Sequence, residues 1–358
     1  MSPALGFGSL GVIAAGLVIG VAAAQAITPG LGGPRPEASE VERKIFADGL
    51  RQFSRAWEEA DGVGERFNEH SCLGCHSAPA AGGSGVAPNT FVLVAGSVDD
   101  GNGGHVFRRL HRTADAVTEL LPPAGASKRK PPSLFGLGLL ELAELRQPAA
   151  PAPGPDRIVG KIGGTAERPG RFGWKARVPD IKTFVAAAFA QELGMSAEPT
   201  SGHNYPLELA TAEVAAFVTL LAPPPRQELD EPARAGERIF AEIGCAQCHT
   251  PSLAPAPEAE AELGYRPEIR AYTDLLLHDM GPDFADAFVE GKAGPADFRT
   301  APLWGLAASG PPYLHDGRAK DVTAAIALHD GDAKPARLRW EQLPPADRAA
   351  LLSFLRSL

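Results

Sequence analysis

All four cysteines of this 358-residue chain lie in two short motifs of the same form. The first is SCLGCH, residues 71–76, and the second is GCAQCH, residues 244–249. Positions i, i+3 and i+4 of a helix share one face, so the two sulfurs and the imidazole of each motif can face one flat ligand. This arrangement is typical of covalent haem c attachment, in which the cysteines form thioether bonds and the histidine binds iron.

Other uses of paired cysteines fit this pattern less well. A redox-active Cys-x-x-Cys needs no histidine after it, and a four-cysteine zinc site brings its pairs within about 15–20 residues of each other. Cys75 and Cys245 are much farther apart. With His76 and His249 as the proximal iron ligands, the sequence predicts two covalent haems c bound through Cys72, Cys75, Cys245 and Cys248.

The segments around the two motifs are also repeated. GERF, residues 64–67, precedes the first motif and GERIF, residues 236–240, precedes the second. Farther along, residues 130–137 (KPPSLFGL) match residues 299–306 (RTAPLWGL). The motif histidines are 173 residues apart (249 − 76), and the later segments are 169 apart (306 − 137). These nearly equal separations indicate a duplicated unit.

Each half of the chain closes with an amphipathic helical pattern, at residues 212–221 and 346–355. A proline run follows the first pattern and predicts a helix end and a linker. We therefore expect a mainly α protein made of two cytochrome-c-like haem domains with long loops, at residues 37–224 and 225–358. Strand signals are sparse, and the best of them is at residues 90–94.

The N-terminus carries a candidate export signal. Residues 1–34 contain no charged side chain, and an apolar run ends in a small-x-small cleavage pattern at residues 24–26. We predict a signal peptide at residues 1–26, a linker at residues 27–36, and export to the periplasm. The run begins without lysine or arginine, and about 20 apolar residues can span a bilayer, so an uncleaved membrane anchor is the alternative.

The ordered set of segments resembles the bacterial di-haem cytochrome c peroxidase superfamily, and within it the di-haem oxidoreductase branch. The matching segments are RFNEHSCLGCHSAPAAGGSG, RKPPSLFGLGLLE, RFGWKARVPDI, IFAEIGCAQCHTP, YTDLLLHDMGPD, FRTAPLWGL and PYLHDGRA. The resemblance implies two haem domains packed together. One haem would accept electrons from a small redox protein, and the other would react with hydrogen peroxide.

The resemblance also suggests the sixth ligand of the second haem. In the superfamily a distal methionine lies fourteen residues after the histidine of a Pro-Tyr-x-His-x-Gly motif. That histidine is His315 here, and position 329 (315 + 14) is His329 instead of methionine. We predict that His249 and His329 both bind the second iron. His278 and Met280 are alternative ligands, and a surface histidine at a helix end is the other interpretation of His329.

The first haem is expected to have His76 on one side and an open or weakly bound site on the other. Peroxide cleavage needs a group that moves a proton. The resemblance implies an acid after the Pro-x-Leu segment of the first domain, where Glu141 and Glu144 are the nearest carboxylates. Glu141 follows an apolar run, so burial would raise its pKa, and it is the predicted catalytic acid. A solvated helix residue is the alternative.

Two further features come from the matching segments. Trp174 and Trp304 are expected to serve in core packing, the common use of tryptophan, with electron relay as the alternative. The resemblance also implies a calcium ion between the domains, held by backbone carbonyls that correspond to Gly310 and Pro312. Carbonyl ligands leave little trace in side chains, so the sequence leaves calcium open.

The predicted function is that of an exported di-haem c oxidoreductase. It would reduce hydrogen peroxide at the N-terminal haem, with electrons relayed through the C-terminal haem. Two alternatives remain open: oxidation of a protein or small molecule through high-valent iron, and a non-enzymatic electron carrier. The net charge of −9 argues against a nucleic-acid partner, because an acidic surface repels phosphates.

Overall fold

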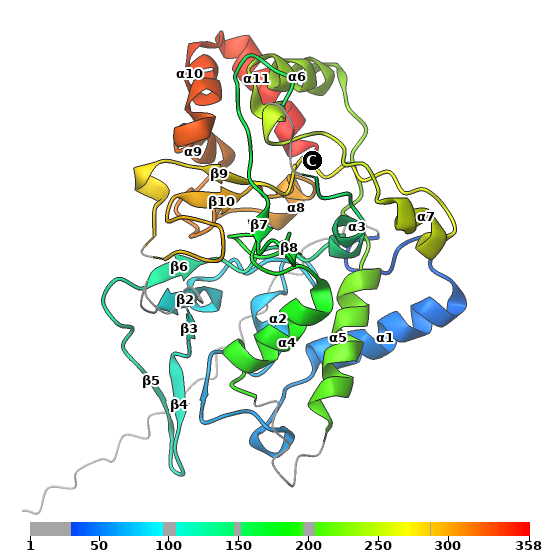
Figure 1. Cartoon of the computed structure of the whole chain (residues 1–358), viewed down its shortest axis with the longest axis vertical. Helices are drawn as coiled ribbons and strands as arrows, with labels where there is room; N and C mark the ends of the chain where they lie inside the picture. The colour runs from blue at the N-terminus through cyan, green and yellow to red at the C-terminus, as the bar shows by residue number, and fades with distance from the viewer. Residues whose placement is uncertain (1–29, 96–104, 147–151, 196–204, 287) are drawn as a thin grey trace, which may run out of the picture.

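The computed structural model describes most of the chain (Figure 1). The described residues are 30–95, 105–146, 152–195, 205–286 and 288–358. The predicted signal peptide, residues 1–26, lies outside them. Among the helices in these ranges, none combines the length and the apolar character needed to cross a lipid bilayer.

Helices dominate the described structure, as predicted, and the strands are short. The helices are α1 (Glu40–Ser54), α2 (Cys72–Cys75), α3 (Leu137–Glu141), α4 (Ile181–Glu192), α5 (Leu207–Leu220), α6 (Glu231–Glu242), α7 (Pro257–Leu263), α8 (Leu306–Ser309), α9 (Val322–Ala327), α10 (Lys334–Gln342) and α11 (Pro345–Arg356). The strands are β1 (Arg66–Phe67), β2 (Val92–Ala95), β3 (His105–Phe107), β4 (Leu110–Arg112), β5 (Val117–Glu119), β6 (Ser127–Arg129), β7 (Gly163–Gly164), β8 (Pro169–Gly170), β9 (Leu277–Asp279) and β10 (Asp297–Arg299).

The first half is built on the crossing of α1 and α5. Phe46 and Phe53 of α1 pack on Phe217 of α5, with ring centroids 5.0 Å and 4.7 Å apart. Gly49 lies between these two aromatics in the sequence, and a Cβ there would stand 2.3 Å from the carbonyl oxygen of Glu213. The glycine therefore lets the two helices approach closely enough for the aromatic rings to interlock.

The second half repeats this crossing with α6 and α11. Phe240 of α6 packs on Phe354 of α11 at 5.4 Å. A Cβ at Gly236 would stand 2.1 Å from the carbonyl oxygen of Ala350. Figure 1 shows α6 and α11 at the top of the molecule and α1 and α5 in its lower half. Each predicted closing helix is thus present and packs on a helix that precedes a Cys-x-x-Cys-His motif. The division at residues 224 and 225 stays a prediction.

The strands form small antiparallel sheets. The predicted strand at residues 90–94 overlaps β2, which lies between β3 and β6, with Leu93 opposite Phe107 and Lys128. A second sheet has the order β1-β4-β5, and β9 pairs with β10. The sequence analysis missed these other strands because two or three residues are too few to show alternation.

Candidate functional site

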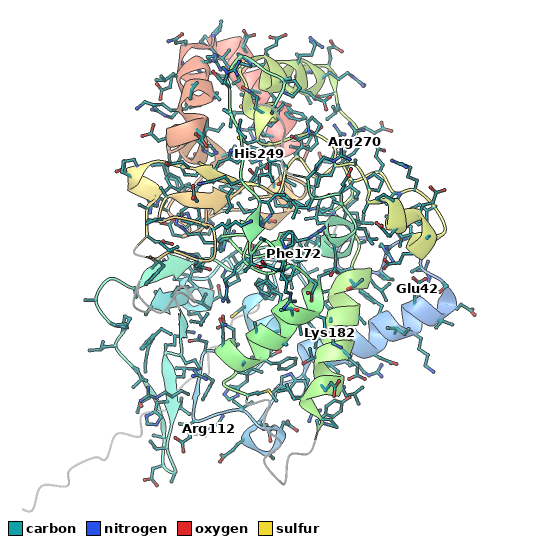
Figure 2. The ribbon with its side chains drawn as sticks, viewed as in Figure 1. Glu42, Arg112, Phe172, Lys182, His249 and Arg270 are labelled. Atoms are coloured by element: carbon teal, nitrogen blue, oxygen red, sulfur yellow. The ribbon has the colours of Figure 1, made fainter. Side chains whose placement is uncertain are left out.

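A single large cavity connects the two motifs within the described structure. Its volume is about 560 Å³, and its lining is mainly apolar. All four cysteines line it, together with His76 and His249. Figure 2 labels two residues of the lining, Phe172 in the first half and His249 in the second. The duplicated motifs therefore face one shared interior space.

The first motif forms the short helix α2. Its N-cap is Ser71, whose hydroxyl accepts a hydrogen bond from the backbone N–H of Leu73. Cys72 and Cys75 are free, and burial raises the pKa of each thiol to about 12. Both sulfurs are therefore neutral thiols that remain available for thioether bonds.

His76, at the end of α2, is fixed by two carbonyl groups. Its Nδ1 lies 3.1 Å from the oxygen of Gly83 and 3.0 Å from that of Pro132. A carbonyl only accepts hydrogen bonds, so Nδ1 carries the proton and Nε2 keeps its lone pair. Burial also lowers the pKa of His76, which keeps the ring neutral. A neutral imidazole with a free Nε2 is the form that binds iron.

The second motif has the same ligand chemistry with a different partner. Nδ1 of His249 donates to the carbonyl oxygen of Tyr272 at 3.1 Å, which again leaves Nε2 free. The Tyr272 hydroxyl donates to Glu237 at 2.6 Å and anchors this loop on α6. Burial, with a smaller effect of nearby His329, lowers the pKa of His249 to about 4.

His329 lines the same cavity near His249. Its Nδ1 donates to the carbonyl oxygen of Ala325 at 2.7 Å, and burial lowers its pKa. It is thus a third neutral imidazole with a free Nε2. The structure brings the two histidines of the predicted bis-histidine pair together, and their role as iron ligands stays a prediction.

His278 and Met280, the alternative ligands, also line the cavity. The His278 ring is occupied on both nitrogens: Nε2 lies 2.8 Å from Asp274, and Nδ1 lies 3.7 Å from Asp332 and 3.6 Å from the Cys248 sulfur. Burial alone would lower its pKa, but these partners outweigh burial and raise it to about 12. A protonated ring has no lone pair for iron, so His278 suits ligation less well than His329.

Glu141 does not line the cavity in the described structure. Its carboxylate accepts a hydrogen bond from the backbone N–H of Ile181 at 3.1 Å, at the first residue of α4. Burial raises its pKa, as the sequence analysis expected. Glu144 lies beside Arg146, with a hydrogen bond of 3.1 Å. Glu141 thus binds the backbone at the start of α4. Its catalytic role stays a prediction.

The sequence analysis missed Glu192, a carboxylate in the last turn of α4 that does line the cavity. Its Oε2 accepts a hydrogen bond of 2.8 Å from the Asn68 amide. Burial raises its pKa to about 7. A sequence signal exists, because Ile181, Val185 and Glu192 share the spacing of one helix face, and the acid continues an apolar stripe.

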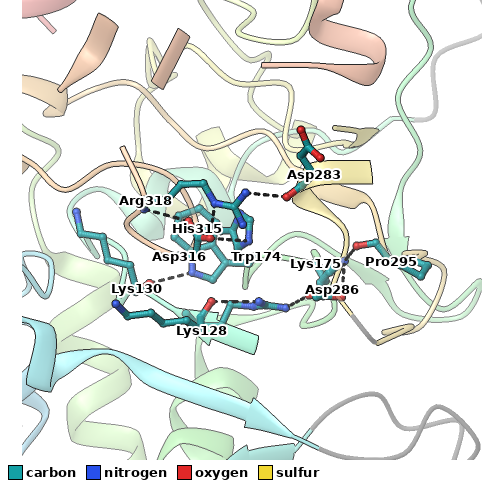
Figure 3. A network of polar contacts seen from close by, with 11 residues as sticks. Lys128, Lys130, Trp174, Lys175, Asp283, Asp286, Pro295, His315, Asp316 and Arg318 are labelled. Carbon is teal, nitrogen blue, oxygen red and sulfur yellow. Dashed lines mark hydrogen bonds and ion pairs between the residues drawn. The ribbon is translucent and has the colours of Figure 1, made fainter. Parts of the chain in front are cut away.

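The wall between the two motifs carries buried charges from both halves (Figure 3). The Lys175 ammonium donates to the carbonyl oxygens of Gly294 at 2.9 Å and Pro295 at 2.7 Å, and it lies 3.3 Å from Asp286. Asp286 also pairs with Arg129. These contacts join residues that are more than a hundred positions apart in the chain, so they hold the two halves in one arrangement.

Trp174 belongs to the same wall. Its Nε1 donates to the carbonyl oxygen of Lys130 at 2.9 Å, and its ring lies edge-on to His315 at 6.3 Å (Figure 3). Trp174 and Trp304 both line the cavity. Core packing as the role of both tryptophans, with electron relay as the alternative, stays a prediction.

The residues around the cavity fit a haem at each motif. Free thiols and neutral imidazoles supply the covalent and iron-binding groups, and the apolar lining suits a porphyrin ring. Cations on the cavity wall suit the two carboxylates of each haem. They include Lys130, whose pKa burial lowers to about 8, and Arg299, whose pKa burial lowers to about 10.

The calcium ion that the resemblance implies would be held by backbone carbonyls, not by side chains. Within the described ranges, no three histidine, cysteine, aspartate or glutamate side chains gather into a metal-ion cluster. Backbone ligation at Gly310 and Pro312 stays a prediction.

Comparisons with solved structures find matches at low identity. A hydrazine synthase from Kuenenia stuttgartiensis is 15% identical, with a TM-score of 0.46 over 98% of this chain and 100% of that chain. A MauG-like protein associated with microbial copper homeostasis is 15% identical, with a TM-score of 0.47 over 93% and 94%. The diheme peroxidase BthA from Burkholderia thailandensis is 16% identical, with a TM-score of 0.49 over 92% and 87%.

The sequence itself matches a protein family. Residues 197–358, which include the second motif and His329, match the family described as "Di-haem oxidoreductase, putative peroxidase". A comparison with curated proteins finds no match. The family resemblance and the assignment to peroxidase-like oxidoreductases are confirmed. The part of the chain that is similar to the di-haem oxidoreductase family is therefore residues 197–358, and the first half carries a Cys-x-x-Cys-His motif of the same form.

Proposed function

We propose that this protein is a di-haem c enzyme that reduces hydrogen peroxide at the N-terminal haem, with electrons arriving through the C-terminal haem. When bound, the haems supply electron transfer and peroxide cleavage. The observation that carries the proposal is a difference between the two halves of the cavity lining. The second half places there the imidazole of His329 with a free Nε2, whereas the first half places there Glu192, a carboxyl whose pKa burial raises to about 7.

Glu192 has the properties of the proton-moving group. Peroxide reduction consumes two protons and two electrons for each hydrogen peroxide and yields two waters. The inner peroxide oxygen must lose a proton, and the outer oxygen must gain one before it leaves as water. With a pKa of about 7, Glu192 can accept and return that proton near neutral pH. Its hydrogen bond to Asn68 holds the carboxyl in one orientation.

The other residues hold the haems in place and keep their ligands ready. The carbonyls of Gly83, Pro132 and Tyr272 keep the Nδ1 protons on His76 and His249, so each Nε2 stays available. His329 would supply a second iron ligand at the second motif, which would suit a haem there to electron transfer. We further propose export to the periplasm through residues 1–26 and a small redox protein as electron partner.

The test uses holoprotein made with a cytochrome maturation system. Mass spectrometry should show two added haems, and electron paramagnetic resonance should show one high-spin and one low-spin centre. The protein should also consume peroxide with a reduced cytochrome as donor. Two low-spin centres without a peroxide response would favour the electron carrier. A high-spin centre that oxidises an organic or protein substrate, but gives no turnover with a reduced cytochrome, would favour the other enzymatic alternative.

A further inference from the structure

A second internal repeat lies beyond the haem motifs. Residues 172–178 and 313–319 form closed loops of the same length, 141 residues apart (313 − 172). In the first loop, Phe172 and Val178 form an antiparallel bridge, and in the second, Tyr313 and Ala319 do the same. The two loops therefore close with the same backbone pairing.

The backbone inside the two loops also agrees. The second position is Gly173 with φ +83° in one loop and Leu314 with φ +72° in the other. The fifth position is Ala176 with φ +46° and Gly317 with φ +73°. All four residues lie in the left-handed region, although at each of the two positions only one loop has a glycine. Since few non-glycine residues adopt positive φ, this agreement marks true structural equivalence.

Each loop then starts a helix with the same cap. Two residues after the bridge, Asp180 accepts a hydrogen bond of 2.7 Å from the Thr183 N–H and begins α4. Asp321 accepts one of 2.7 Å from the Ala324 N–H and begins α9. The separation is again 141 residues, so positions along α4 and α9 can be matched one by one.

The matched positions face the same cavity. In α4 the cavity is lined at the first, fourth and fifth residues, and in α9 at the same three places. These matched pairs are Ile181 with Val322, Phe184 with Ala325, and Val185 with Ile326. The matched helix face thus lines the cavity in each half.

One turn farther along this face, the two halves differ. His329 of the second half corresponds to Ala188 of the first (329 − 141), and both line the cavity. α9 ends at Ala327, but the His329 ring remains tied to the Ala325 carbonyl and stays on this face. α4 continues through Ala188 to Glu192. Where one half offers an imidazole, the other offers only a methyl group.

We propose that Ala188 decides the coordination state of the N-terminal haem: its missing side chain leaves open the sixth position that His329 fills in the other half. The proposal rests on the proposed placement of one haem at each motif. A methyl group at this position leaves room for a small ligand such as peroxide, whereas an imidazole would compete with it. One side chain therefore separates a reacting haem from an electron-transfer haem.

The test installs the missing ligand with Ala188→His in holoprotein. We expect the high-spin signal to be replaced by a second low-spin signal, and cyanide binding to fall at least tenfold. The matched control is Ala186→His, on the exposed side of the same helix and outside the cavity lining, which should leave the high-spin signal unchanged. An Ala188→His protein that carries two haems and keeps a cyanide-binding high-spin centre overturns the proposal.

The reverse substitution decides the matter if Ala188→His fails to fold. His329→Gly should convert the second haem to a high-spin centre, and added imidazole should restore the low-spin spectrum. A His329→Gly spectrum identical to that of the unsubstituted protein overturns the proposal. Mass spectrometry and peroxide turnover of the unsubstituted protein separate this failure from a failure of the proposed function. A chain without two haems, or one with two haems that does not reduce peroxide, contradicts the proposed function whatever the spectra of the two variants show.

Discussion

The two halves of this protein share the chemistry of their Cys-x-x-Cys-His motifs and differ in the other side chains that they place on the wall of the cavity. In both, a Cys-x-x-Cys-His motif follows a helix that crosses the last helix of its half, and the motif histidine donates Nδ1–H to a backbone carbonyl. The cavity linings then diverge, with Ala188 and Glu192 in one half and His329 in the other. The difference teaches that the duplicated halves kept the Cys-x-x-Cys-His motif and its carbonyl partner, while the matched helix faces came to carry different side chains.

The largest expected effect tests whether the carboxyl of the first half is catalytic. Glu192→Gln keeps the size of the side chain but removes its ability to accept a proton. We expect kcat for peroxide reduction to fall by about 10²–10⁴-fold, the usual contribution of a general acid–base group. The measurement is steady-state peroxide turnover with a reduced cytochrome.

Glu141→Gln is the matched control for this substitution, because Glu141 lies outside the cavity lining and accepts from the Ile181 backbone. Its kcat should stay close to that of the unsubstituted protein. Loss of turnover in Glu141→Gln but not in Glu192→Gln would restore the original expectation from the sequence and contradict the assignment made from the cavity.

The pH dependence of peroxide turnover tests the same role of Glu192. Burial raises the pKa of Glu192 to about 7, and the group must be a carboxylate to accept a proton from peroxide. Turnover should therefore fall below pH 7, approaching about tenfold per pH unit, and level off above it. Asn68→Leu removes the hydrogen bond that favours the carboxylate, so the midpoint should move to higher pH. A profile that is unchanged in Glu192→Gln would assign the titration to another group.

The next effect concerns how the two halves are held together. Lys175→Met leaves Asp286 and two carbonyls without their buried ammonium, and breaking such a pair costs about 3–5 kcal/mol. Lys182→Met, on the exposed side of α4 (Figure 2), is the control and should change the free energy of unfolding by less than about 0.5 kcal/mol. Chemical denaturation of holoprotein measures both, and equal stabilities would show that the charged wall does not bind the halves together.

The smallest expected effects test whether the α1–α5 and α6–α11 crossings are packed in the same way. Gly49→Ala and Gly236→Ala each push a methyl group against a backbone carbonyl, so each should destabilise the protein by about 1–3 kcal/mol. Gly33→Ala, whose added Cβ would find its nearest atom at 3.7 Å, should be nearly neutral. Thermal unfolding provides the measurement. Destabilisation by only one of the two crossing variants would mean that the halves do not share this packing.

Much of the architecture could be predicted because its signals are local. The Cys-x-x-Cys-His spacing lies within about one helical turn, and the closing helices α5 and α11 show their apolar stripes directly. The strand β2 was visible from its β-branched residues. The other strands are too short to carry a pattern, and their pairing depends on contacts with distant segments.

The sequence alone determined the two haem motifs, the duplication and the mainly helical class, because each depends on spacing between near neighbours. Only the tertiary structure decided that Glu192 lines the cavity and Glu141 does not: Glu141 turns to the start of α4, while Glu192 lies on the cavity wall. It also decided the partners of the haem histidines, since Pro132 and Tyr272 come from segments remote from His76 and His249. Such choices depend on how helices pack against each other, and packing joins residues whose distance along the chain carries no local signal.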